Sequence, residues 1–218
     1  MNRRTFLQAA SAGSTALVLP ATASNLGGGG CIGDAPEGQT AFEFLGRSDQ
    51  NVTLVTHYGY LTHVFGLTDD LLFSNPNVRT EATALFTFSA STIWDSRHEH
   101  GNIITTSAPG EMSIYLRETP GASFSNPASF AVGAVIATYS VRYFNVLNVQ
   151  APNQGVIATT VELTQRKTKP LAQGNQRCQF GRVGLRARIS ANGEGARTVV
   201  NPVQAFFLVG GTAVVTDR

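Results

Sequence analysis

Residues 130–169, FAVGAVIATYSVRYFNVLNVQAPNQGVIATTVELTQRKTK, decide the fold. Two long segments rich in Val, Ile, Thr, Tyr and Phe flank the break Ala151-Pro152-Asn153-Gln154-Gly155. β-Branched and aromatic residues favour strands, whereas Pro, Asn and Gly favour turns, so this stretch predicts a long β-hairpin. Each arm has roughly 14 to 18 residues, against a usual strand length of about 5 to 6. Strands of this length are typical of a barrel or a strongly coiled sheet.

The rest of the chain predicts further hairpins. Residues 41–45 and 52–67 form the first, around a polar turn at Ser48-Asp49-Gln50-Asn51. Residues 81–94 alternate between apolar and polar side chains, and residues 103–118 return after a turn at 100–102. Residues 180–189 and 199–215 predict the last two strands, joined by a turn at Asn192-Gly193-Glu194-Gly195. The chain therefore contains about eight strands in sequential hairpins.

This organisation predicts an all-β fold, an antiparallel up-and-down β-barrel of about eight strands in a single domain spanning residues 41–218. The sequence shows no alternation of strands with helices, no heptads and no fixed-period repeat, which excludes dinucleotide-binding folds, helix bundles and solenoids. A sandwich is the alternative, but long strands with short connections favour the barrel. The interior of an eight-stranded barrel is either filled by side chains or holds one small ligand.

The N-terminus resembles a twin-arginine export signal. Arg3-Arg4-Thr5-Phe6-Leu7 precedes a short apolar run, and Ala21-Thr22-Ala23 matches a cleavage site, so residues 1–23 are predicted to be a signal peptide. Residues 24–40 follow as a Gly-rich arm. Cleavage lowers the number of basic residues from 16 to 14, equal to the 14 acidic ones. We therefore expect an exported protein, periplasmic or extracellular, that neither binds nucleic acid nor stays inserted in a membrane.

The two cysteines, Cys31 and Cys178, allow three interpretations. In an oxidising compartment they are candidates for one disulfide that ties the arm to the barrel. A lipid-modified Cys31 is disfavoured, because Gly28 stands where the usual motif has an aliphatic residue. The third interpretation is two free thiols.

Motifs for nucleophilic catalysis or phosphate binding are missing from the sequence. His98-Glu99-His100 has a spacing used by some metal sites in β-barrels, but the expected Glu about four residues later is replaced by Ile104 and Thr105. We interpret this segment as a solvated hairpin tip. The sequence predicts neither a metal site nor a cofactor.

Polar and aromatic side chains of the barrel strands are the candidate functional residues. The catalytic candidates are Arg142, Glu162 and Tyr139, and the ligand-binding candidates are Tyr58, Tyr60, Phe86, Phe88, Trp94 and Tyr143. Each Tyr could instead be a core residue with a satisfied hydroxyl. Pairing around the turn 152–154 sets Arg142 opposite Thr164 and one diagonal step from Glu162. An inward Arg142 would anchor a ligand oxygen, whereas an outward Arg142 would form only a weak surface ion pair.

The layout of long hairpins after a secretory leader, together with GYLTHVFGL at residues 59–67, resembles the allene oxide cyclase and dirigent barrel superfamily. The resemblance implies a cofactor-free barrel, often a homo-oligomer, that holds a hydrophobic or aromatic molecule and guides its cyclisation, isomerisation or coupling. Two other hypotheses remain: a non-catalytic carrier of lipocalin type, and a structural surface domain with a filled barrel.

The export signal is tested by replacing Arg3 and Arg4 with Lys. Lysine keeps the charge but lacks the planar guanidinium fork that a twin-arginine signal depends on, so we expect the precursor to stay in the cytoplasm. Cell fractionation measures this. Full yield of the double variant outside the cytoplasm would show that the leader is not a twin-arginine signal.

Overall fold

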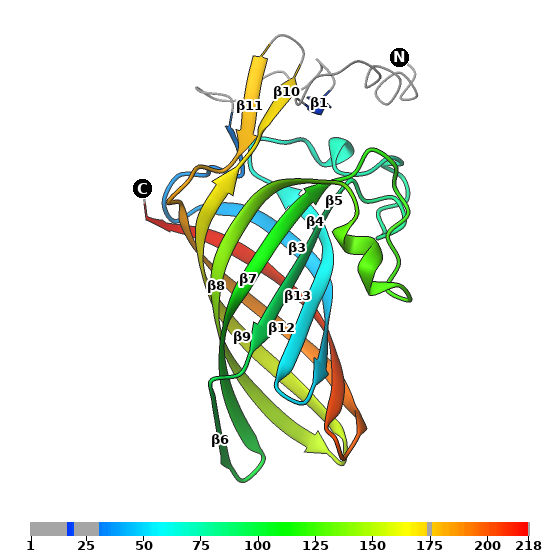
Figure 1. Ribbon diagram of the computed structural model, residues 1–218, viewed down its shortest axis with the longest axis vertical. Coiled ribbons are helices and arrows are strands. Elements are labelled where there is room, and N and C mark those ends of the chain that lie inside the picture. The colour runs from blue at the N-terminus through cyan, green and yellow to red at the C-terminus, as the bar shows by residue number, and fades with distance from the viewer. Residues whose placement is uncertain (1–16, 20–30, 174–175, 218) are drawn as a thin grey trace.

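The computed structural model describes residues 17–19, 31–173 and 176–217. Its main body is a closed antiparallel barrel of eight strands with one additional strand, which confirms the predicted fold class (Figure 1). The barrel strands are β3 (Thr40–Asn51), β4 (Leu54–Val64), β5 (Phe86–Ile93), β7 (Ile103–Leu116), β8 (Ala134–Ala151), β9 (Gln154–Thr168), β12 (Arg186–Val199) and β13 (Gln204–Asp217).

The barrel closes between β5 and β7. Along the sheet the strands follow the order β5-β4-β3-β13-β12-β9-β8-β7, and β5 pairs again with β7, where Phe88 lies opposite Ile114. The additional strand β6 (Ser96–His100) continues along β7 beyond the end of β5 and reaches the tip of the barrel. His98 and His100 of β6 are exposed.

The long hairpin forms β8 and β9, but its register differs from the expected one. Pro152 and Asn153 make the turn between Ala151 and Gln154, and a bulge lies between Val149 and Ala151. Together these shift the pairing, so Arg142 lies directly opposite Glu162 and not opposite Thr164. A bulge adds a residue to one strand only, and a count outward from the turn cannot anticipate it.

Two predicted turns are wrong. Residues 48–51 belong to β3, and the chain turns at residues 52–53. Residues 192–195 belong to β12, which runs on to Val199. Gly193 and Gly195 lie where a Cβ atom would come within 2.2 and 1.9 Å of backbone oxygens of β13, so these glycines permit a close strand approach and do not mark a turn.

A small sheet covers the end of the barrel opposite β6 (Figure 1). It contains β1 (Leu17–Leu19), β10 (Pro170–Gln173), β11 (Gln176–Phe180) and β2 (Cys31–Ile32). Phe180 is fully buried, and its ring centroid lies 6.2 Å from that of Phe42 in the barrel. β1 falls within the predicted signal peptide, whose other residues, including Arg3 and Arg4, lie outside the described part of the chain.

The two cysteines lie on neighbouring strands of this sheet. β2 pairs with β11 so that Cys31 is opposite Gln179, one residue from Cys178. Burial, and then the nearby Cys31, raise the pKa of the Cys178 thiol. The two sulfur atoms are not bonded in the structure, and the disulfide stays a prediction.

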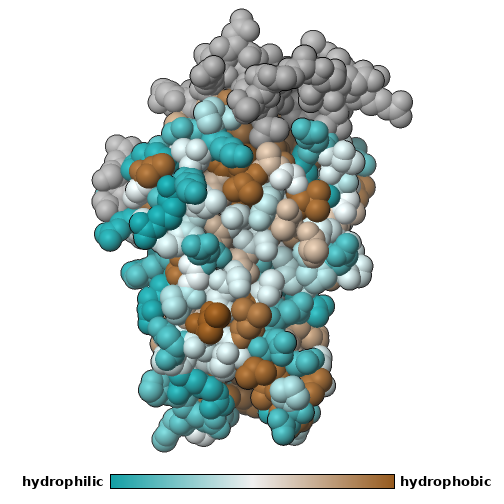
Figure 2. All heavy atoms as spheres, in the orientation of Figure 1, coloured by the Kyte–Doolittle hydropathy of each residue, from teal (hydrophilic) through white to brown (hydrophobic). Residues whose placement is uncertain are grey.

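A segment that we call the strap, residues 119–133, crosses the outside of β4 and β5 and contains the short 3-10 helix η2 (Pro127–Ala131). A second one, η1 (Asp69–Leu71), follows β4. The strap packs Phe124 and Phe130 against Tyr58, with ring centroids 6.1 and 5.3 Å from the tyrosine ring. Part of the outer wall is therefore a second apolar layer, while Figure 2 shows the remaining hydrophobic residues of the viewed face as separate patches among hydrophilic ones.

Arg117 holds the strap. Its side chain is only 6% exposed and donates hydrogen bonds to the backbone oxygens of Thr119, at 3.2 Å, and Ser129. We expect Arg117→Met to lower the free energy of unfolding by about 2 kcal/mol, because two carbonyls lose a charged donor. Urea unfolding measures the loss.

The control is Arg142→Met. Arg142 is exposed and binds Asp95 at 2.9 Å, and an exposed ion pair contributes at most about 1 kcal/mol. Equal losses in the two variants would contradict the role assigned to Arg117.

Candidate functional site

The barrel encloses a cavity at the end that carries β6. Its volume is about 880 Å³, and it reaches from the turns at residues 52–53, 102 and 153 inward to the middle of the barrel. Most of the lining is apolar. The closed end is formed by side chains from six strands: Phe44, His57, Phe88, Tyr143, Val161 and Ile189.

Small residues among the larger ones of the wall contribute to the empty space of the cavity. In the other half of the barrel, large side chains such as Phe86, Ile136 and Leu163 are fully or almost fully buried and fill the interior. Towards the β6 end, Gly155, Gly195 and Ala205 border the lumen. These residues do not extend into the lumen, and the larger side chains beside them do not fill the space that is left.

His57 is the central polar residue of the closed end. Its Nδ1 lies 2.8 Å from Ser48 Oγ, and its Nε2 lies 3.1 Å from Thr92 Oγ1. In a neutral imidazole one nitrogen donates a hydrogen bond and the other accepts one, so the two hydroxyls satisfy both. Burial lowers the pKa of His57 to about 3, and the ring is neutral at physiological pH.

Tyr143 reaches His57 from the opposite wall. The two rings stack with centroids 4.3 Å apart and planes 11° from parallel, which joins β4 to β8 across the lumen. Burial raises the pKa of the Tyr143 phenol, so the hydroxyl stays protonated. The stacked pair forms the floor of the cavity.

A second polar cluster lies between β7, β8 and β9. Thr159 Oγ1 donates to Asn145 Oδ1 at 2.7 Å, and Asn145 Nδ2 lies 3.4 Å from Thr106 Oγ1. All three residues line the cavity. Charged side chains gather at the mouth, where Arg97 pairs with Glu99 at 2.5 Å and Arg197 Nε donates to Asn153 at 2.9 Å.

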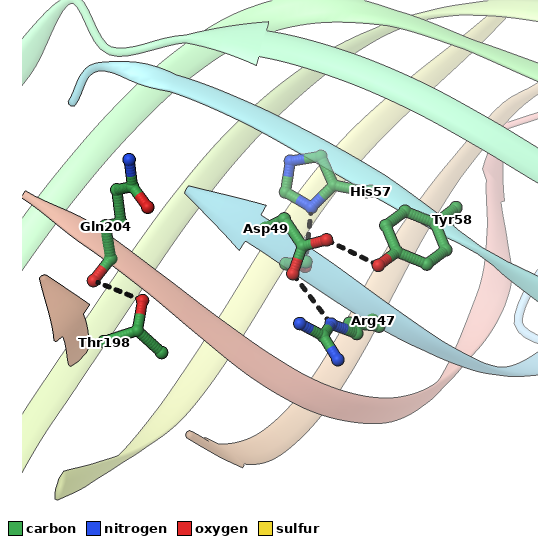
Figure 3. Close-up of polar contacts among 7 residues, drawn as sticks. Arg47, Asp49, His57, Tyr58, Thr198 and Gln204 are labelled. Carbon is green, nitrogen blue, oxygen red and sulfur yellow. Dashed lines mark hydrogen bonds and ion pairs between the residues drawn. The ribbon is translucent and has the colours of Figure 1, made fainter. Parts of the chain in front are cut away.

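The outer face of β3 and β4 carries a separate polar network (Figure 3). Asp49 accepts a hydrogen bond from the Tyr58 hydroxyl at 2.5 Å and pairs with Arg47 at 2.7 Å. Burial, followed by the hydrogen bond to Asp49, raises the pKa of Tyr58. His57 points into the barrel and Tyr58 points out of it, as neighbours on a strand must.

The predicted ligand-binding residues fall into three groups. Phe88, Trp94 and Tyr143 line the cavity. Phe86 points inward but is fully buried in the filled half of the barrel. Tyr58 and Tyr60 lie on the outer wall, where Phe124 of the strap packs against both rings, so their assignment to the cavity is corrected.

The predicted catalytic residues do not form a site inside the barrel. Arg142 and Glu162 have side chains 54% and 67% exposed on the outer wall, where Arg142 binds Asp95 and Glu162 binds Arg188. Tyr139 is buried in the filled half of the barrel. This placement removes the basis for Arg142 as an anchor for a ligand inside the barrel.

Among the described residues, no group of His, Cys, Asp and Glu is arranged to hold a metal ion. Likewise, no helix in this part of the chain is long and apolar enough to cross a membrane. Comparisons with models of protein families, with curated proteins and with solved structures found no match. The site defines a class only: a closed antiparallel barrel with an internal, mainly apolar cavity.

The buried His57 makes stability depend on pH. Its pKa is about 3 in the folded protein and 6.5 in the unfolded chain, so only the unfolded chain takes up a proton between these values. The contribution of the neutral His57 to stability is complete above pH 6.5 and is lost as the pH falls towards 3. We expect His57 alone to lower the free energy of unfolding by about 2 kcal/mol when the pH falls from 7 to 5.

His57→Gln should remove this part of the pH dependence, since Gln can bond to both hydroxyls without titrating. Urea unfolding at several pH values measures the slope. His98→Gln, at an exposed position, controls for the loss of an imidazole as such. An unchanged slope in His57→Gln would mean that His57 is not held neutral by burial.

Proposed function

We propose that this protein binds a small, mainly apolar molecule inside its barrel. The observation that carries the proposal is the cavity of about 880 Å³, which is closed at the His57–Tyr143 floor and reaches the turns at the β6 end. Binding sites for small molecules typically have volumes of about 300 to 1,000 Å³, mostly apolar walls and a few polar groups. The cavity argues against a structural domain with a filled barrel.

The chemistry of the cavity favours a carrier over an enzyme. His57 stays neutral down to a pH of about 3, and the Tyr143 phenol holds its proton, so neither exchanges protons readily near neutral pH. The charged residues of the lining lie at the mouth or, like Arg47, are paired on the outer face. A cyclase or isomerase of the allene oxide cyclase or dirigent type therefore has less support than a carrier of lipocalin type.

The leader suggests where the protein acts. Arg3 and Arg4 support export through the twin-arginine route, and a carrier of apolar molecules has a use in an aqueous compartment outside the cytoplasm. We include a homo-oligomer in the proposal only because the resemblance to the allene oxide cyclase and dirigent superfamily implies one.

Binding is tested with 1-aminoanthracene, a neutral apolar dye whose emission rises in a dry pocket. We expect saturable binding with one site per chain. Leu147 lines the cavity, so Leu147→Trp should fill part of it and weaken binding at least about tenfold. Fluorescence titration measures the affinity.

The matched control is Val146→Trp, which places the same side chain on the neighbouring residue of β8, on the outer wall. It should bind the dye as the wild type does. If both variants lose affinity equally, or if the wild type does not bind the dye, the cavity is not the binding site.

A further inference from the structure

The Tyr143 side chain has an unused hydrogen-bond donor. It lies deep inside the barrel and lines the cavity, and its ring is fixed by the stack on His57. Within the described part of the chain, the Tyr143 hydroxyl forms no hydrogen bond. The hydroxyl oxygen has no partner, yet it is not completely buried, so part of its surface is accessible. We assign that surface to the cavity, whose lining includes Tyr143.

The imidazole beside Tyr143 is already satisfied. Both nitrogens of His57 are occupied by Ser48 and Thr92, which leaves the imidazole unable to bind a ligand atom. Asn145 and Thr159 bond to each other further along the wall. A polar group that arrives at the floor can therefore accept a hydrogen bond from the Tyr143 hydroxyl without displacing a hydrogen bond within the protein.

The closed end favours a neutral acceptor over an anion. A phenol that keeps its proton is a good donor and a weak acceptor, so its partner must supply a lone pair. A carboxylate would lose its hydration there without gaining a cation, because His57 is neutral and Arg97 and Arg197 lie at the mouth. Burial of an unpaired charge costs several kcal/mol, whereas a ketone or ester oxygen is desolvated at much lower cost.

We propose that the ligand is a neutral, oxygen-bearing apolar molecule, such as a ketone, ester or quinone, whose carbonyl oxygen accepts a hydrogen bond from Tyr143 at the floor of the cavity. This inference rests on the proposed function, since it names the class of ligand for the same cavity. Tyr143 sets specificity, and the apolar walls supply most of the affinity.

The test uses two probes of nearly equal shape, 2-acetylnaphthalene and 2-isopropenylnaphthalene, which differ by a carbonyl oxygen against a methylene group. Their affinities are measured by displacement of 1-aminoanthracene from the wild type and from Tyr143→Phe. Tyr143→Phe should weaken the ketone about tenfold and change the hydrocarbon by less than about twofold. A third probe, 2-naphthoate, should bind the wild type more weakly than the ketone does.

Tyr139→Phe is the matched control. Tyr139 lies on the same face of β8, four residues from Tyr143 and outside the cavity lining, so its hydroxyl should not affect either probe. If Tyr143→Phe binds the ketone as tightly as the wild type, or loses both probes equally, the assigned hydrogen bond is wrong while the binding cavity stands. If the wild type binds neither the dye nor the probes, the proposed function fails as well.

Discussion

The pairing of β5 with β7 is the constraint on which the rest of the structure depends. It turns an open sheet into a barrel and so gives each strand an inner and an outer face. In β4 this alternation places His57 inside and Tyr58 outside. The inner face of each strand borders the interior of the barrel. The outer face contacts either water or the strap, which covers Tyr58.

The sequence predicts the architecture well because strand alternation and turn residues are local signals. The long hairpin and the inward face of Phe86 and Phe88 follow from alternation alone. The register of the hairpin does not follow from alternation. The bulge near Val149 moves Arg142 to a position opposite Glu162, and such a bulge depends on how the whole wall twists. Alternation also does not predict whether Arg142 points into the barrel or out of it, because the residues on that face of β8 are of mixed polarity.

The sequence predicts only part of the candidate site, namely Phe88, Trp94 and Tyr143, and the reason is physical. The polar segment from Ser48 to Asn51 has the composition of a turn, yet it continues β3, and the side chains of Ser48 and Asp49 have partners on β4. Ser48 bonds to His57, and Asp49 bonds to Tyr58 on the opposite face. Alternation along β4 does separate His57 from Tyr58 and Tyr60, and this signal could have shown that these three residues cannot share the lumen.

The same interactions that hold the barrel together also divide its interior. The His57–Tyr143 stack connects β4 and β8, which are separated along the wall by β5 and β7 and meet only across the lumen of a closed barrel. On one side of the stack, large side chains fill the space and supply the core. On the other side, where Gly155, Gly195 and Ala205 stand among larger residues, the cavity remains. We therefore expect substitutions of the fully buried side chains in the half without a cavity to lower the free energy of unfolding more than substitutions around the mouth.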